Sequence, residues 1–436
     1  MKKITYTFAV FILLQTLLFA QNNLQVLPET TSDNGGISIE RLSLLDKHIE
    51  KFIQEGNVPG GVFTIVRKGK KVYHKSFGYR SLDKKIPYQK DDIFRLASMT
   101  KAFTTVSIMQ LYERGKLGLD DPIFYYIPAF AKMTVLDQFN KSDSSFTAIE
   151  TKKKITIRHL LTHTSGITYG SFNPGKVQAV YIKSGINDFG LSHPKMTTEQ
   201  MVNKIAKAPL IFEPGEKYMY GLNMEVLGRI IEVVSRKPLN EYFRDNIFEP
   251  LNMKDTYFYL PKSKQDRLVP VYTYNRERKI VMASATDFGS IVQYPKMKDN
   301  NHYAGGGGAS GTASDYAVFI QALLNKGIYN GKRILSRKSI ELMTADQQIL
   351  LNQKGNGYSK IPGITYGLGF ALITNQGRAV SHKSSGTYQW GGVFNTKFFI
   401  DPKEELIFVG MTQIVPFRRG DFWKKMYAIL YGAIED

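Results

Sequence analysis

The sequence predicts a mixed α/β protein in which an antiparallel sheet is assembled from both ends of the chain, with a mostly helical segment inserted between them. Two observations support this fold class. Runs of β-branched and aromatic residues lie near the beginning and the end, whereas the apolar residues in the middle follow helical spacing. A sheet flanked by helices buries both patterns in one core. We expect one catalytic domain over 38–436, with a sheet subdomain at about 38–95 and 305–436 and a helical subdomain at about 96–304.

The first elements are a hairpin and a helix. Residues 61–66 and 71–78 are strand-like and are separated by Lys68-Gly69-Lys70, which predicts a β-hairpin. Residues 99–111 have helical spacing, with Ala102, Val106, Met109 and Leu111 on or near one side. Further helical patterns cover 201–208, 225–235 and 239–248.

The C-terminal part returns to strands after one more helix. Residues 314–325 place apolar residues at helical spacing from Tyr316 onward, with Ser314 as the expected cap. Strands are predicted at 367–373, 392–400 and 405–412, with a turn at Asp401-Pro402-Lys403. A final amphipathic helix is expected at about 421–434.

The first twenty residues have the pattern of a signal peptide. Lys2-Lys3 precede a mostly apolar stretch over 4–18, and Ala20 offers a small residue before a cleavage point. We therefore expect residues 1–20 to be removed and the protein to be periplasmic or secreted, with an uncleaved anchor as the alternative.

Composition excludes several classes of protein. The absence of cysteine excludes disulfides, thiol catalysis and Cys-ligated metals. Lys+Arg 58 against Asp+Glu 38 gives a net charge of +20, which would attract an anionic envelope surface or an acidic polysaccharide. No aromatic residues alternate with the basic runs, so we expect no nucleic acid partner, and no obligate protein partner is evident.

Neither a metal nor an organic cofactor is expected. The seven histidines include no H-E-x-x-H motif, and the pair His159 and His163 is expected to serve helix packing and capping. Residues 306–311 satisfy G-x-G-x-x-G, but no buried strand precedes them, as a dinucleotide site requires. We interpret these glycines as a tight backbone segment near the site.

A nucleophile and a base are suggested at the start of the helix over 99–111. Ser98 and Lys101 are three residues apart, so both side chains leave one face of the helix about 5–6 Å apart at Cβ. A serine hydroxyl needs a nearby base, and a lysine can act as one only when burial or other cations favour its neutral form. The helix N-terminus also favours negative charge on a developing oxyanion.

Further motifs give this pair a context. They are residues 94–101, 159–166, Glu213-Pro214-Gly215, Tyr220, 305–316 and Trp390-Gly391-Gly392. In this order and spacing, over about 40–430, the chain resembles the serine β-lactamase-like superfamily, which contains class C β-lactamases, penicillin-binding DD-peptidases and family VIII esterases. The resemblance implies the serine β-lactamase/DD-peptidase fold.

The resemblance also implies roles for individual residues. Ser98 would be the acylated nucleophile, Lys101 its proton acceptor or electrostatic partner, and Tyr220 the proton shuttle. The amide of Val393, directly after Gly391-Gly392, would join the amide of Ser98 in binding the oxyanion.

Two departures from the family pattern bear on the substrate. Tyr220-Gly221-Leu222 has leucine where the β-lactamase motif has asparagine, and Asn223 comes one position late. Trp390 stands where β-lactamases and DD-peptidases have the lysine that binds the substrate carboxylate, and its indole offers an apolar wall.

These departures favour an exported esterase that acts through an acyl-enzyme on a small-molecule or glycan-linked ester. Two alternatives remain open. One is a DD-peptidase or weak β-lactamase, and the other is a catalytically silent glycan-binding protein on the same scaffold.

Overall fold

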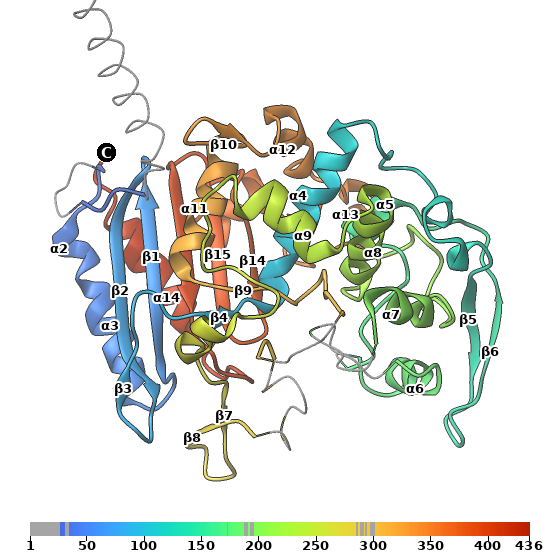
Figure 1. The fold of residues 1–436 in the computed structure, drawn as a ribbon, viewed down its shortest axis with the longest axis horizontal. Coiled ribbons are helices and arrows are strands. Elements are labelled where there is room, and N and C mark those ends of the chain that lie inside the picture. Colours follow the sequence, from blue (N-terminus) through green and yellow to red (C-terminus); the bar gives the residue numbers. More distant parts are fainter. Residues whose placement is uncertain are drawn as a thin grey trace, which may run out of the picture.

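An eight-stranded antiparallel sheet forms the centre of the molecule in a computed structural model of the chain (Figure 1). The structure describes residues 27–30, 35–171, 173–186, 191, 196–284, 287, 292, 294–296 and 301–436. The strands, in their order across the sheet, are β12 (Ile364–Tyr366), β13 (Ala371–Ile373), β14 (Tyr388–Gly392), β15 (Thr396–Asp401), β16 (Leu406–Met411), β1 (Gly60–Arg67), β2 (Lys70–Ser81) and β3 (Ile86–Pro87). The two ends of the chain meet where β1 pairs with β16, as the fold class predicted.

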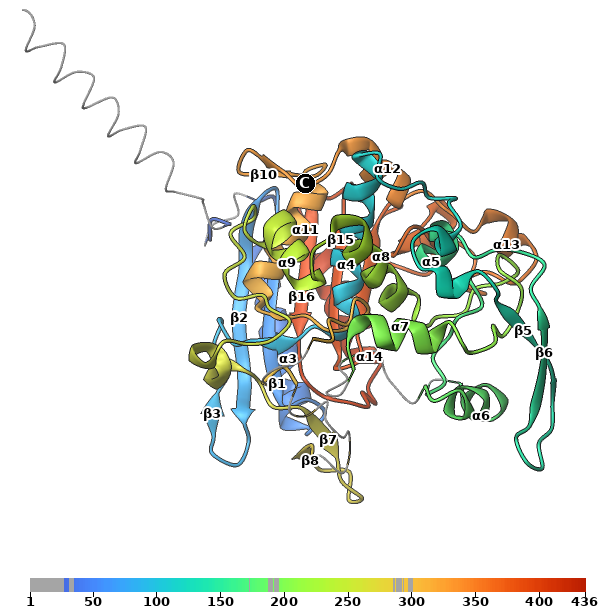
Figure 2. The same ribbon diagram turned by 45° about the vertical axis from the view of Figure 1, so that its right-hand side comes forward.

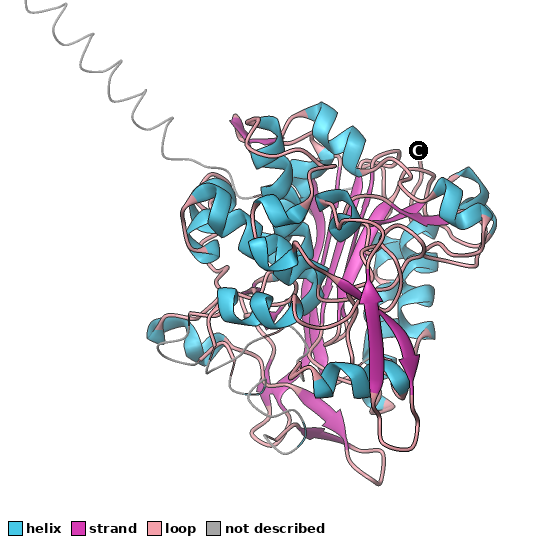
Figure 3. Ribbon diagram, turned by 90° about the vertical axis from the view of Figure 1, so that its right-hand side faces the viewer, coloured by secondary structure: helices cyan, strands magenta, loops and turns pink. Residues whose placement is uncertain are grey.

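Helices cover both faces of this sheet (Figure 3). On one face, α2 (Ile39–Leu42), α3 (Leu44–Gln54) and α14 (Asp421–Gly432) bury a cluster that includes Phe63 and Phe408. On the other face, α11 (Ala313–Leu324) packs on β1 and β16 and shares the main core with Val62 and Val409. Alternate residues of a strand point to opposite faces, so each central strand contributes to both clusters.

The inserted segment is mostly helical and lies on the α11 side of the sheet (Figure 2). Its helices are α4 (Thr100–Glu113), α5 (Ile157–Leu161), α6 (Lys176–Lys183), α7 (Thr198–Ile205), α8 (Asn223–Ser235) and α9 (Leu239–Phe243), with 3₁₀ helices η1 (Ala97–Met99), η2 (Ile123–Tyr125), η3 (Pro128–Phe130) and η5 (Lys262–Arg267) and the π-helix η4 (Arg244–Phe248). After α11 come α12 (Arg337–Met343), α13 (Ile349–Gln353) and the 3₁₀ helix η7 (Asn375–Ala379). Four short pairs complete the fold: β4 (Phe94–Arg95) with β9 (Ser310–Gly311), β5 (Thr134–Phe139) with β6 (Phe146–Glu150), β7 (Tyr272–Tyr274) with β8 (Ile280–Met282), and β10 (Ile328–Tyr329) with β11 (Lys332–Arg333).

Several predicted elements are confirmed. The N-terminal hairpin is β1 and β2, the helix over 225–235 is α8, and the last helix is α14. The helix predicted over 239–248 changes from an α-helix to a π-helix after Phe243. The helix at 99–111 is confirmed as α4. It does not bury a single apolar face, because residues 100–111 are all buried between the sheet and the other helices.

Three details differ from the sequence prediction. Thr312, rather than Ser314, caps α11, since its hydroxyl accepts from the amide of Asp315. The strand predicted over 392–400 begins only at Thr396, as β15, because Gly392 ends β14 and a turn separates the two strands. The strand predicted from residue 367 begins only at Ala371.

The predicted signal peptide, residues 1–20, lies outside the described residues. Within the part of the chain that the structure describes, no helix combines the length and the apolar character needed to cross a bilayer.

Candidate active site

Ser98 is fixed by the two-stranded ribbon that precedes it. β4 pairs with β9, and the amide of Leu96 donates to the carbonyl of Ala309 at 2.9 Å. Ala97 then adopts φ +46°, a left-handed conformation that is uncommon for a residue with a Cβ atom. This sharp bend starts η1 and leaves the half-buried Ser98 at the N-terminal end of α4.

Lys101 lies beneath Ser98 and is completely buried. Its Nζ donates to the carbonyl of Gly306 at 2.6 Å, to the Tyr169 hydroxyl at 3.3 Å and to Ser98 Oγ at 3.4 Å. An ammonium has three N–H donors, so these three acceptors match its full donor capacity. The glycine segment at 305–308 is therefore near the site, as expected from the sequence, because its carbonyl holds Lys101 in place.

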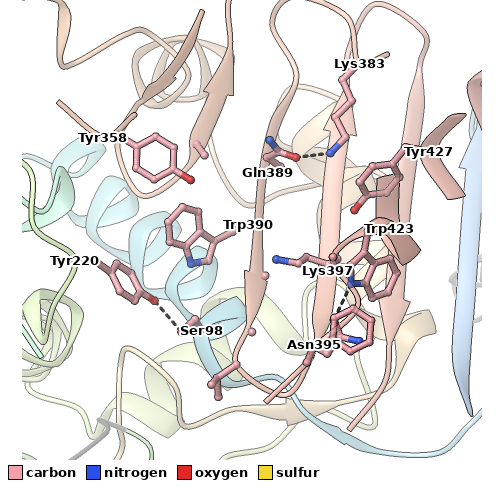
Figure 4. A pocket seen from close by; sticks show the side chains of 16 residues that line it. Ser98, Tyr220, Tyr358, Lys383, Gln389, Trp390, Asn395, Lys397, Trp423 and Tyr427 are labelled. Atoms are coloured by element: carbon pink, nitrogen blue, oxygen red, sulfur yellow. Dashed lines mark hydrogen bonds between the residues drawn. The ribbon is translucent and has the colours of Figure 1, made fainter. Parts of the chain in front are cut away.

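Tyr220 approaches Ser98 from the loop before α8. Its hydroxyl donates to Ser98 Oγ at 2.8 Å, and Lys101 Nζ lies 4.9 Å from the centre of its ring (Figure 4). Gly221 allows the approach, because a Cβ atom there would lie 2.3 Å from Thr168 Cα. Ser98, Lys101 and Tyr220, predicted from three separate motif positions, are thus in one hydrogen-bonded group.

The predicted motif Trp390-Gly391-Gly392 lies on β14, on the far side of Ser98 from Tyr220 (Figure 4). β13 pairs with β14 only at Tyr388 and Gln389, so among the described strands the edge of β14 from Trp390 onward faces no neighbour on that side. A Cβ atom on Gly392 would lie 2.5 Å from the carbonyl of Leu96, which shows how closely this strand passes the segment that carries Ser98. Val393 packs against Ala97 in a small apolar cluster.

A cavity of about 660 Å³ brings these groups together. Its lining includes Ser98, Tyr220, Trp390, Gly391, Gly392 and Val393. Of the residues predicted for the site, Lys101 alone does not line the cavity, because it lies below Ser98 and Tyr220.

The rings of Trp390, Tyr220 and Tyr358 form one wall of the cavity, and the buried ring of Tyr366 packs against Trp390. The Trp390 indole lies 5.5 Å from the Tyr220 ring, 5.4 Å from Tyr366 and 6.0 Å from Tyr358, measured between ring centres. Burial raises the pKa of the Tyr358 and Tyr366 hydroxyls above their ordinary value, so both remain protonated and neutral. The wall is therefore uncharged and suited to an apolar or aromatic part of a substrate.

The motif Tyr220-Gly221-Leu222, together with the following Asn223, places no amide side chain in the cavity. Leu222 is completely buried in the main core. The side chain of Asn223 also turns inward, where Nδ2 contacts His163 Nδ1 at 2.8 Å and donates to the carbonyl of Ile167 at 3.2 Å. No amide from this motif therefore lines the cavity within the described residues.

The two histidines of the 159–166 motif have different environments. His159 takes part in a capping box with Thr156 at the start of α5, as expected. His163 instead packs 4.8 Å from the Tyr220 ring, and burial, together with the charge of Lys101, lowers its pKa well below the ordinary range. It is a neutral ring that positions Tyr220.

Sequence reasoning missed four residues around the site. Tyr169 contacts Lys101, and Gln389, Lys383 and Lys397 line the cavity beyond β14. Only Gln389 had a usable clue, its place directly before Trp390; the two lysines have no motif of their own. Among the described residues, no group of three or more His, Asp or Glu side chains could hold a metal ion.

Comparisons with known proteins agree with this geometry. A family model described as Beta-lactamase matches residues 45–428. Protein Rv1367c of Mycobacterium tuberculosis is 29% identical over 84% of this chain and 89% of its own length. Esterase EstB of Burkholderia gladioli is 26% identical over 85% of this chain and 90% of its own. The solved structure of EstCE1, a hydrolase with promiscuous acyltransferase activity, has a TM-score of 0.75 at 27% identity and covers 90% of this chain and 99% of that one.

Proposed function

The chain belongs to the beta-lactamase family, and from this premise we propose that it is a serine hydrolase that cleaves carboxylic esters through an acyl-enzyme on Ser98. The observation that carries the proposal is the contact of Ser98 Oγ with both Tyr220 (2.8 Å) and Lys101 (3.4 Å) at the wall of a cavity. Similarity to EstB and EstCE1 supports the ester as substrate.

Acylation starts from the state in which Tyr220 and Lys101 together carry one proton fewer than a phenol and an ammonium, so that Ser98 Oγ donates to the Tyr220 oxygen. Oγ attacks the ester carbonyl as its proton passes to that oxygen. The shorter distance favours Tyr220 as the direct proton carrier. Lys101, whose ammonium lies near the Tyr220 ring, stabilises negative charge on the Tyr220 oxygen. The amides of Ser98 and Val393 bind the tetrahedral oxyanion, and each such donor is worth about 2.7–4 kcal/mol in a comparable enzyme.

The tetrahedral intermediate then collapses and expels the alcohol, which receives the proton from Tyr220. A water molecule attacks the acyl-enzyme and gives its proton to the same pair, which returns it to Ser98 Oγ as the acid leaves. The overall reaction consumes one ester and one water and releases one alcohol and one acid, and the chain returns to its starting state.

Ester rather than peptide specificity rests on Trp390. An indole supplies no positive charge at the position where the family's peptide- and β-lactam-cleaving members have a lysine, and its neighbours Tyr358 and Tyr366 are neutral. The second motif likewise offers no amide to a peptide group, since Asn223 is turned into the core.

The decisive experiment is mass spectrometry of the protein after reaction with a fluorophosphonate. We expect one adduct, on the peptide that contains Ser98, and none in Ser98→Ala. Label on another residue, or ester turnover by Ser98→Ala at the rate of the original protein, would refute the proposal.

A substrate panel separates the esterase from its alternatives. Short-chain 4-nitrophenyl esters should be cleaved with a higher kcat/KM than nitrocefin or an acyl-D-Ala-D-Ala peptide. A preference for the peptide would contradict the interpretation of Trp390, and glycan binding without covalent labelling would support the silent binding protein.

We also propose that the protein is exported. The proposal rests on the N-terminal pattern of Lys2-Lys3, an apolar stretch and Ala20. N-terminal sequencing of the protein purified from its native host would test it, with Gln21 expected as the first residue.

A further inference from the structure

The candidate cavity continues past the edge of β14 into a region that the proposed chemistry does not use. Beyond Gly391 its lining includes Lys383, Gln389, Lys397, Trp423 and Tyr427, and the side chains of the two lysines point toward β14 (Figure 4). We call this region the lysine pocket. It lies on the α14 side of the sheet, whereas Trp390 and Tyr220 lie on the other side of the strand.

Lys383 is a buried cation with only neutral neighbours in direct contact. Its side chain is 6% exposed and Nζ donates to Gln389 Oε1. Nζ also lies 3.9 Å from the centre of the Tyr427 ring and 4.8 Å from that of Phe399. Burial, and secondly the charge of Lys397, lower the pKa of Lys383 to about 7.

Lys397 extends across the strand toward the candidate site. It pairs with Gly391 in the sheet, and a Cβ atom on Gly391 would lie 2.7 Å from its Cδ and 3.0 Å from its Nζ. Glycine at position 391 therefore leaves the space that this side chain fills. Gly392, the next residue, touches the backbone before Ser98, so at roughly 3.3 Å per residue along a strand the Lys397 ammonium lies within the span of a small ester.

Neither ammonium is neutralised by an acidic side chain. In the part of the chain that the structure describes, no carboxylate lies within 4.0 Å of Lys383 or Lys397. Asp401, on the same strand as Lys397, accepts from Tyr431 and from the amides of Ser384, Lys403 and Glu404. Two amines that face one cavity without a carboxylate in contact offer N–H donors to an anion, and a bound anion would favour their charged forms.

We propose that the lysine pocket binds a carboxylate carried by the ester substrate, and that the substrate chain passes over Gly391 to bring its ester to Ser98. A singly charged carboxylate on an apolar chain fits this lining, because the two lysines are flanked by the rings of Trp423 and Tyr427. The proposal rests on the proposed esterase function and specifies its substrate class. The anion site differs from the Trp390 position, which has no charge.

Matched substrates test this directly. One pair is 4-nitrophenyl hydrogen adipate and its methyl ester, which differ only in a charge on the acyl side. The other pair, 3-carboxyphenyl and 3-carbamoylphenyl butyrate, places the charge on the alcohol side. In at least one pair we expect kcat/KM for the anion to exceed that for the neutral ester about tenfold, as for one hydrogen bond to a charged group. This ratio should decrease when the salt concentration is raised from about 0.1 M to about 1 M.

Lysine variants assign the effect to the pocket. Lys397→Met keeps the length of the stem and should reduce the ratio to near one, and Lys383→Met should lower it severalfold. Lys84→Met removes an exposed charge in the β2–β3 turn, at the opposite end of the sheet, and should leave the ratio unchanged. Lys397→Gln provides a second variant if Lys397→Met does not fold.

Binding can be followed without turnover, because Trp390 and Trp423, the two tryptophans of the chain, both line the cavity. Adipate should change their fluorescence in Ser98→Ala, and this change should be lost in Ser98→Ala/Lys397→Met. No preference for the anion in either substrate pair, or a preference that Lys397→Met and Lys383→Met leave unchanged, overturns the lysine pocket and leaves the esterase intact. Full turnover of the neutral esters by Ser98→Ala would instead overturn the esterase.

Discussion

Replacing Lys383 with methionine should change how the stability of the protein depends on pH. Its ordinary pKa is 10.5, and burial with help from Lys397, opposed by Asp401, lowers it to about 7. At 1.36 kcal/mol per unit, the folded state disfavours the ammonium by about 4–5 kcal/mol. The unfolded chain binds the proton more tightly, so this penalty is almost absent above pH 10.5, grows as pH falls, and is complete below about pH 7.

Lys383→Met removes the penalty at the cost of the hydrogen bond to Gln389, about 1 kcal/mol. At pH values where Lys383 is protonated, it also loses the cation–π contacts with the Tyr427 and Phe399 rings, about 1 kcal/mol more. We therefore expect the variant to be about 2–3 kcal/mol more stable than the original protein near pH 6 and slightly less stable near pH 10.

Urea unfolding measures this difference at each pH. Tryptophan fluorescence and far-UV circular dichroism should give coincident transitions, which justifies a two-state free energy. Titrating groups other than Lys397 and Asp401, which interact with Lys383, cancel when the two proteins are compared, and Lys84→Met should show no pH-dependent difference. A difference between Lys383→Met and the original protein that stays constant from pH 6 to pH 10 would refute the reasoning.

Three further predictions concern the site around Ser98. Tyr220→Phe removes the hydroxyl that contacts Ser98, so kcat for a 4-nitrophenyl ester should fall roughly 10²–10⁴-fold while the far-UV spectrum is unchanged. Gly392→Ala places a Cβ atom 2.5 Å from the Leu96 carbonyl, so steady-state kinetics should show a loss in kcat of about tenfold or more, as expected for a displaced oxyanion donor. Ala97→Gly should raise the free energy of unfolding by up to about 1 kcal/mol, because residue 97 has φ +46°, whereas Ala97→Val should lower it; equal values in urea titrations would contradict this.

The sequence predicted best what depends on local pattern. The hairpin of β1 and β2 and the helices α8 and α14 were predicted because their apolar periodicity and turn residues involve only residues close together in the sequence. Ser98, Lys101 and Tyr220 were found because their chemistry requires fixed residue types at fixed spacing.

What depends on distant contacts was not predicted. β14 contains two glycines and has little strand character; it is a strand because β15 pairs with it along its length. The small pairs β5–β6 and β7–β8 were also missed. Lys383 and Lys397 are ordinary lysines in the sequence. Lys383 is buried against Tyr427 of α14 and Lys397 lies over Gly391 of β14, and nothing near them in the chain indicates these contacts.

Pairing of β1 with β16 determines when the molecule can acquire its activity during synthesis. Ser98, Lys101 and Tyr220 have all been made when about half of the chain is synthesised, but the central strand β1 waits for residues 406–411, its partner on one side. A nascent chain therefore contains its reacting groups long before it has a sheet to hold them. Contacts between such distant residues slow folding, and until residues 406–411 are in place the unpaired flank of β1 is a strand edge open to wrong pairing.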